Sequence, residues 1–550
     1  MPGAETFGFL SILPPVIAIV LAILTRRVLI SLFIGIWFGG AIKVQAFADS
    51  TNILFGSIKA GALGFTQTAD WIVTSLTSTW NMKILLFIML LGPGTAFIWK
   101  TGGSEAIRRA ASDKFDTPKG VSVLTWILGM LIFFDDYANS AIVGSAMKDI
   151  SDKMRISKEK LSYIIDSTAA PISTFLLSTW VGYQLSMIKK GYEAAGITEI
   201  APSTFSMFIS SIPYNIYCIL AVIMVGIIII TGRDYAEMLN AEHRSWTTGK
   251  VIADDDTPMQ TIEKDIGDPI LKKPMLRSIF IPIFVLISTI LLGIWLTGYA
   301  EGRGLIEIFA NASIGNNLLW GGFTMVFAEM ALAIRYRILD FGEVMDTFRD
   351  GLKVMITAAA ILTLAWSIGT TTSELGTAKY VVEQTRHIIT PQILPIVIIL
   401  SSAFIAFCTG SSWGTMAIVT PIAVPMAYET GNIGLIPAAV GSTFSGAIFG
   451  DHCSPISDTT VLSSIFSGAD HIAHVRTQIY YASTVLVVTL LLYLVNGYTG
   501  ISPVILIPIG ILALIALVYI LSELDSNRKG VPAKTNEYDK EKIMGEIRKK

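Results

Sequence analysis

The sequence predicts an all-α polytopic membrane protein, and composition, run length and charge placement all support this fold class. Of the 550 residues, 52% are hydrophobic and 15% are charged, whereas a soluble domain carries about 25% charged residues. Many apolar runs approach the roughly 20 residues that a helix needs to cross a bilayer. The charge gathers mainly in 232–277, in the tail after Glu523 and in short clusters such as Arg26-Arg27.

The apolar runs predict the helices in chain order. They are expected at 8–24, 28–47, 83–100, 120–134, 172–188, 212–231, 277–299, 317–338, 353–369, 392–408, 476–496 and 502–522. The segment 53–78 is amphipathic, so whether it crosses the membrane stays open. Four further apolar segments are interrupted by polar residues, Gly or Pro, namely 138–150, 161–171, 412–428 and 434–468. In total we expect about eleven to fourteen membrane segments, some of them broken.

Basic residues orient the chain and divide it into parts. Arg26-Arg27 follow the first predicted helix, which predicts a cytoplasmic turn and an N-terminus outside the cell. The mixed-charge segment 232–276 predicts a cytoplasmic linker between two membrane halves, residues 1–231 and 277–522. The basic residues of 523–550 predict a charged cytoplasmic tail.

The two halves carry matching motifs, which predict an internal repeat. In the first copy, about 83–190, Asp166 precedes Pro171-Ile172-Ser173; in the second, about 353–468, Asp451 precedes Pro455-Ile456-Ser457. Basic residues follow the leading helix of the first copy and precede that of the second, which indicates inverted copies. Inverted repeats with broken helices are typical of secondary transporters whose site lies near the membrane midplane.

Five carboxylates within or beside apolar segments are the candidate functional residues. They are Asp135, Asp136, Asp166, Asp451 and Asp458. Each would cost about 2.5–3.5 kcal/mol at a helix centre, so each is expected to be neutral or to ligate a cation. The neighbouring hydroxyl and amide candidates are Asn139, Ser167, Thr168, Ser173, Ser411, Ser412, Ser457 and Thr459. Such hard oxygen ligands suit Na⁺, and we expect Na⁺ at Asp166, Asp451 and Asp458.

Some of these residues and their neighbours also fit other roles. Asp136 and Asp458 also fit helix N-caps, where Asp is favoured. Pro171 and Pro455 are expected to interrupt their helices and free backbone carbonyls for a ligand. His452 is expected to act as a hydrogen-bonding or proton-relaying group, because its neighbour Cys453 diverges from it on a helix. Glu329 is a further intramembrane acid, and a fair candidate for the transport pathway.

Several enzyme and pump classes lack their signatures. The sequence has no HExxH and no Walker A motif, which disfavours a zinc protease and an ATP-driven pump. An intramembrane aspartyl protease would show GxGD, but Ile448 stands where the first Gly should be. We therefore expect no enzyme and no cofactor. A channel remains possible, although broken inverted repeats favour alternating access.

Two long strings resemble one family. FFDDYANSAIVGSAMKDISDKMRISKEKLSYIIDSTAAPIS (133–173) and TFSGAIFGDHCSPISDTTVLSS (443–464) resemble the NhaC family of Na⁺/H⁺ antiporters, and the likeness extends over about 8–522. It implies the ion-transporter superfamily, a scaffold with an elevator-type transport domain, a homodimer and a bacterial inner membrane. The family motif points to Asp135, Asp136, Asp166, Ser167, Thr168, Asp451, His452, Ser457, Asp458 and Thr459.

The resemblance and the acids together predict an antiporter that exports Na⁺ in exchange for H⁺. The alternative is a Na⁺-coupled transporter or exchanger of a small organic solute on the same fold, such as a dicarboxylate, lactate or an amino acid. The two motifs hold no obvious intramembrane Lys or Arg to anchor a carboxylate, although a helix N-terminus offers another anchor. The expected partners are Na⁺, H⁺ and the lipid bilayer, with no nucleic acid.

Overall fold

The computed structural model describes most of the chain. The described residues are 7–25, 27–44, 53–103, 106, 117–133, 136–176, 178, 180–197, 202–258, 276–304, 307–308, 311–385, 390–431 and 433–534. Asp135, most of the predicted tail and part of the predicted linker lie outside these residues. Within them the secondary structure is helical, with one isolated β-bridge between Arg233 and Lys534.

The helices of the first half are α2 (Leu13–Thr25), α3 (Val28–Lys43), α4 (Ile53–Thr77), α5 (Thr79–Lys100), α7 (Pro118–Leu131), α8 (Asp136–Lys153), α9 (Lys158–Ser173), α10 (Trp180–Ala194), α11 (Thr204–Ser211) and α12 (Ile216–Thr231). Next come α13 (Ala236–Thr248), α15 (Arg277–Gly298), α17 (Ile314–Arg335), α18 (Phe341–Val354), α19 (Ile356–Leu375) and α20 (Thr377–Thr385). The last are α21 (Leu394–Thr409), α22 (Ser412–Gly431), α23 (Ile436–Cys453), α24 (Asp458–Ser467), α25 (His471–Thr499) and α26 (Pro503–Lys529).

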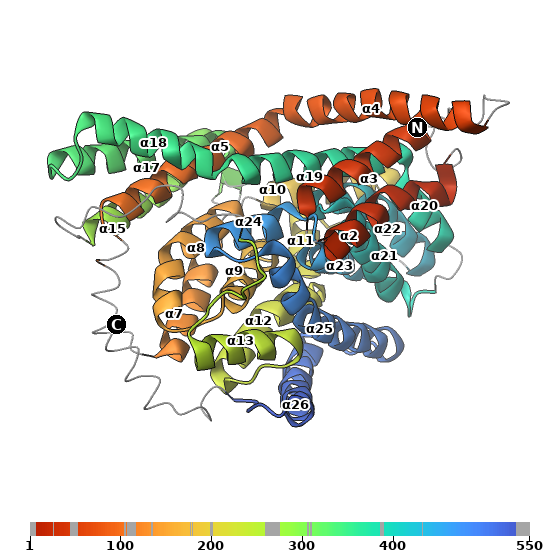
Figure 1. Ribbon diagram of the computed structural model, residues 1–550. Coiled ribbons are helices and arrows are strands. Elements are labelled where there is room, and N and C mark those ends of the chain that lie inside the picture. Colours follow the sequence, from red (N-terminus) through yellow and green to blue (C-terminus); the bar gives the residue numbers. More distant parts are fainter. Residues whose placement is uncertain are drawn as a thin grey trace.

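The helices fall into an outer layer and a body. Figure 1 shows α4, α5, α15, α17 and α18 across the top of the molecule, with α7 to α9, α12, α13 and α23 to α26 below them. In the outer layer α5 packs against α17 and α18, and α15 packs against α17. In the body α24 lies on α8 and α9, while α25 contacts α9, α12 and α23. Helices from the two halves of the chain therefore meet around α9.

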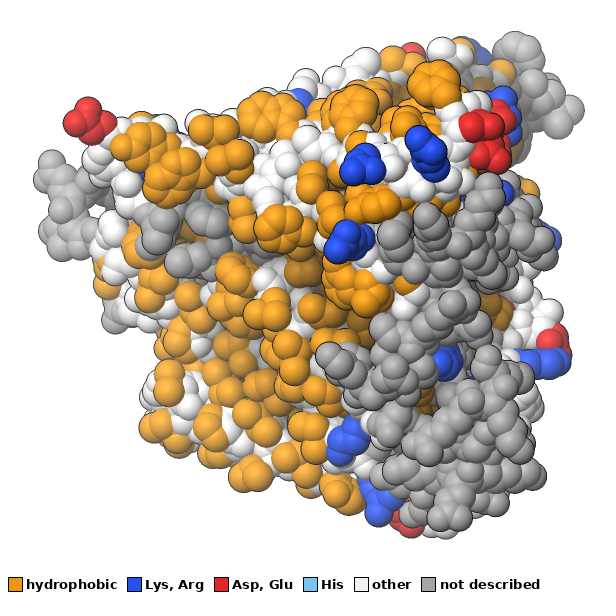
Figure 2. Space-filling model, turned by 90° about the vertical axis from the view of Figure 1, so that its left-hand side faces the viewer, with side chains coloured by type: hydrophobic (Ala, Val, Ile, Leu, Met, Phe, Trp, Pro, Cys, Tyr) orange, Lys and Arg blue, Asp and Glu red, His pale blue; other side chains and the backbone are white. Residues whose placement is uncertain are grey.

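Seven helices are long and apolar enough to cross a bilayer within the described residues, or eight if the bent pair α11–α12 counts as one span. Shorter apolar helices, such as α3 and α21, make up part of the larger number expected from the sequence. Large apolar side chains point outward, as Phe284 and Leu512 do with 70% and 68% exposed. Figure 2 shows one face on which hydrophobic side chains are abundant and charged ones few. The chain is a multi-pass membrane protein.

Several helix predictions need correction. The predicted helix 172–188 is wrong, because α9 ends at Ser173 and α10 begins at Trp180. Polar groups stabilise this break: the Ser178 hydroxyl donates to the Ser173 carbonyl at 2.5 Å and accepts from the Trp180 N–H at 3.1 Å. Helices α8 and α22 run without a break through 138–150 and 412–428, despite the polar residues, Gly and Pro in these segments. Neighbouring helices tolerate such internal prolines and glycines in membrane segments.

The interruption predicted in 434–468 is confirmed. Helix α23 ends at Cys453 and α24 begins at Asp458, so Pro455 lies in the break. Gly410, whose φ of 62° is left-handed, ends α21 beside this break. A Cβ at Gly410 would collide with the Ile456 carbonyl, so only glycine permits this close approach.

The predicted linker contains a helix that docks on the body. Helix α13 packs against α9 and α25. Glu242 of α13 accepts hydrogen bonds from the Ser157 N–H and hydroxyl at 2.9 and 2.7 Å. Lys160 of α9 pairs with Asp234 at 2.7 Å and with Glu242 at 3.3 Å, and all three are buried. This part of the segment is therefore tied to the start of α9 by a buried ionic cluster.

Candidate functional site

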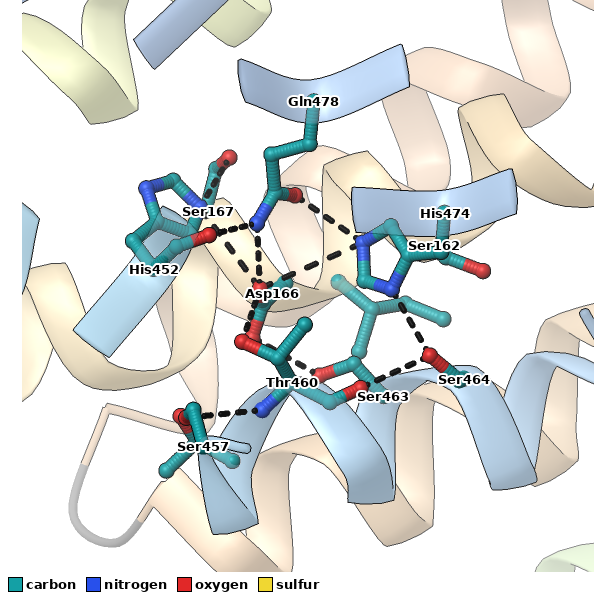
Figure 3. A network of polar contacts seen from close by, with 12 residues as sticks. Ser162, Asp166, Ser167, His452, Ser457, Thr460, Ser463, Ser464, His474 and Gln478 are labelled. Carbon is teal, nitrogen blue, oxygen red and sulfur yellow. Dashed lines mark hydrogen bonds and ion pairs between the residues drawn. The ribbon is translucent and has the colours of Figure 1, made fainter. Parts of the chain in front are cut away.

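Asp166 lies at the centre of a buried polar network. Its side chain projects from the middle of α9 with 1% of the residue exposed. The hydroxyls of Thr460 and Ser463 on α24 donate to its carboxylate, each at 3.1 Å, and the Gln478 amide on α25 donates at 2.6 Å. Figure 3 shows these groups of α24 and α25 converging on Asp166. Three hydrogen bonds of this kind allow a carboxylate to be buried with its charge.

Asp451 stands next to this network, in the last turn of α23. It is 1% exposed, and its Oδ2 accepts a 3.0 Å hydrogen bond from the Thr459 hydroxyl. Its Oδ1 is buried and has no hydrogen-bond partner among the described residues. The Thr459 hydroxyl also lies 3.0 Å from the Ser457 hydroxyl. Asp451 thus has one carboxylate oxygen without a described hydrogen-bond partner, beside two hydroxyl groups.

Thr460 connects Asp166 to the backbone of Asp451. Its hydroxyl lies 3.1 Å from Asp166 Oδ2 and 3.4 Å from the Asp451 carbonyl oxygen. Gln478 connects Asp166 to the next residue of α23, because its amide nitrogen lies 2.6 Å from Asp166 Oδ2 and 2.5 Å from the His452 carbonyl. The matched aspartates of the two predicted repeats therefore meet at one place.

The helix break beside Asp451 is built by local capping. The Ser457 hydroxyl accepts from the Thr460 N–H at the start of α24, which is the ordinary role of an N-cap serine. Asp458 is the first residue of α24 rather than its cap. The Pro455 carbonyl is taken by the His471 ring at 2.8 Å. Pro171 behaves differently from the expectation, because α9 continues through it, and its carbonyl accepts from the Thr174 hydroxyl.

His452 joins the network through both ring nitrogens. Its Nε2 lies 3.0 Å from the Ser167 hydroxyl and 3.8 Å from Asp166 Oδ2, and its Nδ1 lies 2.9 Å from the Tyr217 hydroxyl. The ring is buried, with 4% of the residue exposed. His452 therefore links α9, α12 and α23 beside the two carboxylates.

The other predicted residues have hydrogen-bond partners outside the Asp166 network. Asp458 accepts from the Tyr137 hydroxyl at 2.7 Å and from the Trp366 indole at 3.2 Å. Asp136 accepts from the Trp180 indole at 3.1 Å. The Asn139 amide nitrogen lies 2.7 to 3.0 Å from three backbone carbonyls, those of Gly129, Ile132 and Thr168. Asp135 lies outside the described residues.

Four hydroxyls from the predicted set make mainly local contacts. Thr168 donates to Ile164 and Ile165 carbonyls within α9, and Ser173 donates to the Ala169 and Phe133 carbonyls. Ser411 accepts from the Gly414 N–H at the start of α22, and Ser412 beside it is buried. No hydrogen bond described for these four joins them to Asp166 or Asp451. They shape the helices around the network.

Sequence reasoning missed Ser463 and Tyr217, which contact Asp166 and His452. It also missed three polar residues of α25 beside the network, His471, His474 and Gln478. The His474 ring contacts the Gln478 amide oxygen at 2.9 Å and the Ser464 hydroxyl at 2.8 Å. Their spacing of three and then four residues places them on one helix face. That periodicity in HIAHVRTQ was the available signal, and it stands just ahead of the apolar run.

The chemistry of the network suits a hard cation and a proton. In the described part of the chain, no three His, Cys, Asp or Glu side chains come together as a metal centre. The oxygens that do converge are carboxylate and hydroxyl oxygens, which favour a hard ion over a soft one.

Known proteins resemble this chain over much of its length. A model of the Na⁺/H⁺ antiporter family matches residues 174–498. A protein of Haemophilus influenzae, named only as uncharacterized, is 33% identical over 497 residues, or 89% of this chain and 91% of that protein. The Na⁺/H⁺ antiporter NhaC of Alkalihalophilus pseudofirmus is 30% identical over 30% of this chain and 35% of its own.

Two further relatives complete the comparison. The malate-2H⁺/Na⁺-lactate antiporter of Bacillus subtilis is 29% identical over 32% of this chain and 37% of its own. The solved YdaH transporter of Alcanivorax borkumensis matches with a TM-score of 0.36 and 14% identity, over 80% of this chain and 89% of that one. A likeness of that size carries no argument about the fold. The family model, by contrast, spans more than half of this sequence. This multi-pass membrane protein therefore belongs to the Na⁺/H⁺ antiporter family and is a secondary transporter.

Proposed function

We propose that this protein exports Na⁺ in exchange for H⁺. The observation that carries the proposal is the buried Thr460 hydroxyl, which lies between the Asp166 carboxylate and the Asp451 backbone carbonyl. A site that holds either Na⁺ or H⁺ next to these acids, and is open to one side at a time, exchanges the two ions. The match to the Na⁺/H⁺ antiporter family supports Na⁺ and H⁺ as the two exchanged ions.

We assign the cation to Asp451 and the proton side of the exchange to Asp166. Asp166 already accepts three hydrogen bonds, so a cation there would have to displace donors. Asp451 Oδ1 has no described partner, and the Thr459 and Ser457 hydroxyls lie beside that carboxylate. The sequence suggested Na⁺ at Asp166, Asp451 and Asp458. We leave Asp458 out of the Na⁺ ligands, because its carboxylate is oriented toward Tyr137 and Trp366.

The finer architecture belongs to the same proposal. The meeting of Asp166 and Asp451 supports two inverted repeats that face each other at the site. We propose that the body moves past the outer layer as an elevator-type transport domain, and that the protein is a homodimer in the bacterial inner membrane. The N-terminus would lie outside and the C-terminus in the cytoplasm, as the basic residues indicate.

The second candidate function is exchange of a small organic solute together with Na⁺ and H⁺. The name of the Bacillus subtilis relative, a malate-2H⁺/Na⁺-lactate antiporter, favours it. Against it, the string from Phe449 to Thr460 contains no Lys or Arg to hold a carboxylate.

Proteoliposomes distinguish the two functions. Vesicles holding an imposed pH gradient and a trapped pH dye receive Na⁺ alone, and then Na⁺ with malate, lactate or an amino acid. Collapse of the gradient on Na⁺ alone supports the first function. No collapse until an organic solute is added supports the second.

The assignment of Asp451 is tested by Asp451→Asn in the same assay. The variant should lose Na⁺-dependent exchange while remaining monodisperse in size-exclusion chromatography. Exchange at the wild-type rate would remove Asp451 from the proposal. Glu329→Gln serves as the matched control, because it also neutralises a buried intramembrane acid.

A further inference from the structure

A cavity at the surface of the body reaches toward the buried network. It measures about 370 Å³, and its lining includes Arg27, Thr257, Thr357, Asp470 and His471. These residues come from the start of α3, the segment 251–258, α19 and the start of α25. His471 is 2% exposed, so it is the buried wall of a cavity that opens to solvent.

Hydrogen bonds lead from His471 inward. Its Nδ1 lies 3.0 Å from the Ser464 hydroxyl, and that hydroxyl lies 2.8 Å from His474 Nδ1. His474 Nε2 then contacts the Gln478 amide oxygen at 2.9 Å and stands 4.0 Å from Asp166 Oδ2. Figure 3 shows the inner part of this path, with Ser464 and His474 on one side of Asp166.

The hydrogens of this path do not balance when both histidines are neutral. His471 Nε2 faces the Pro455 carbonyl, an acceptor, so Nε2 carries the hydrogen. His474 Nε2 faces the Gln478 amide oxygen, because the Gln478 amide nitrogen points at Asp166 and the His452 carbonyl. Both Nδ1 atoms are then acceptors, and the Ser464 hydroxyl, which also lies 2.8 Å from the Thr460 carbonyl, has a single hydrogen for all three acceptors.

One added proton satisfies both contacts between Ser464 and the histidine rings. With His471 as the imidazolium, its Nδ1–H donates to Ser464 Oγ and the Ser464 O–H donates to His474 Nδ1. With His474 as the imidazolium, both hydrogen bonds reverse. This geometry allows one added proton to be shared between the two rings through one hydroxyl.

We propose that His471, Ser464 and His474 form a proton-transfer path between the cavity and Asp166. This inference rests on the proposed Na⁺/H⁺ exchange and names its proton route. A proton from the cavity binds His471; the Nδ1–H bond of His471 then breaks as an O–H bond forms on Ser464. The original Ser464 hydrogen passes to His474 Nδ1, and the charged His474 ring stands 4.0 Å from the Asp166 carboxylate.

Other ionisable groups surround the path. In the described residues, Asp166 of α9 stands 4.0 Å from His474, and Tyr217 of α12 contacts His452 of α23. Arg27 and Asp470 line the cavity, and Asp256 lies near Asp470. Burial raises the pKa of Asp256, and the neighbouring Asp470 carboxylate raises it further. The buried cluster of Lys160, Asp234 and Glu242 contacts α25 further along that helix. There Asp234 accepts a hydrogen bond from the Tyr481 hydroxyl at 2.7 Å. Helix α24 offers the path only hydroxyl groups at Thr460, Ser463 and Ser464.

The test separates proton coupling from cation movement in proteoliposomes. Na⁺-driven H⁺ flux is followed with a trapped pH dye, and Na⁺/Na⁺ self-exchange with radioactive Na⁺. The variants are His471→Gln, Ser464→Ala and the two combined, with Thr357→Val as a control on the same cavity wall. In His471→Gln, Ser464→Ala and the double variant we expect H⁺ flux to fall about 10²-fold, within the range that positioned proton-transfer groups contribute. Na⁺/Na⁺ self-exchange should stay at the wild-type rate in these three variants.

Three results distinguish the explanations. The double variant should be no slower than either single variant, because both residues lie on one path. Wild-type H⁺ flux in His471→Gln and Ser464→Ala would overturn the path, and so would equal losses of H⁺ flux and self-exchange, which indicate a structural role. If the unaltered protein exchanges no Na⁺ for H⁺, the proposed function fails and the path falls with it.

Discussion

Asp166 and Glu329 are both buried carboxylates of this membrane protein, with 1% and 0% of the residue exposed, yet their surroundings differ completely. Asp166 accepts three hydrogen bonds from α24 and α25. Neither carboxylate oxygen of Glu329 has a hydrogen-bond partner among the described residues. Glu329 lies on α17 in the outer layer, where α5 and α15 are its neighbours.

From this difference we propose that Asp166, and not Glu329, changes its charge during transport. A buried carboxylate without donors is far more costly as an anion than one that accepts several hydrogen bonds. Protonated Glu329 avoids that cost and has no described route for exchange. Asp166 is surrounded by groups that stabilise its charge and connect it to Asp451 and the histidines. Intramembrane position alone therefore does not mark a transport residue.

The largest effect is expected from Asp166→Asn. The substitution removes the charge and places an NH₂ group against the donors of Thr460, Ser463 or Gln478. Na⁺-driven H⁺ flux in proteoliposomes should fall by about 10²-fold or more. Flux near the wild-type rate in a well-folded Asp166→Asn protein would show that the hydrogen-bonded acid is structural, and the comparison with Glu329 would lose its meaning.

A smaller loss is expected from Gln478→Leu, which removes one donor from Asp166 and one from the His452 carbonyl. Leaving buried acceptors unsatisfied costs about 1–3 kcal/mol. The thermal unfolding temperature in detergent should therefore drop, and exchange should slow without disappearing. An unchanged unfolding temperature together with wild-type exchange would contradict the bonds described for Gln478.

Asp458→Asn should have a milder effect than either. Asp458 accepts from Tyr137 and Trp366, and the amide oxygen of Asn can accept both bonds. We expect Na⁺-dependent exchange to persist with its apparent Na⁺ affinity little changed. Abolished exchange would return Asp458 to the cation site that the sequence first suggested.

The smallest effect is expected from Glu329→Gln, because a neutral amide resembles a protonated carboxylic acid in size and polarity. Exchange and unfolding temperature should both match those of the unaltered protein. A loss as large as that in Asp166→Asn would show that the outer layer takes part in ion movement, and would overturn the contrast between the two acids.

The central pair of the site could be predicted from sequence because it depends on local pattern. Asp166 and Asp451 each precede a Pro-Ile-Ser motif. An acid in an apolar run also loses its solvation by water, and that cost alone marks it as a candidate functional residue. The break around Pro455 followed in the same way, from a proline and capping hydroxyls within one short string. These signals need no knowledge of the neighbours in space.

The rest depended on contacts between distant segments. Nothing near Asp458 in the sequence reveals that Tyr137 and Trp366 donate to it, so these two partners were not predictable. The continuous path of α9 through Pro171 depends on the surrounding packing. His474 and Gln478 were overlooked because they border an apolar run, and their partner Asp166 lies about 300 residues away in sequence.

The central claim is that Na⁺ at Asp451 and a proton in the Asp166 network exclude each other. Calorimetric titration of the purified protein with Na⁺, repeated from acidic to alkaline pH, measures this directly. If one proton competes with one Na⁺, the dissociation constant should rise by about tenfold for each pH unit below the titration midpoint, and Asp451→Asn should not bind Na⁺. A dissociation constant that is independent of pH would contradict the account.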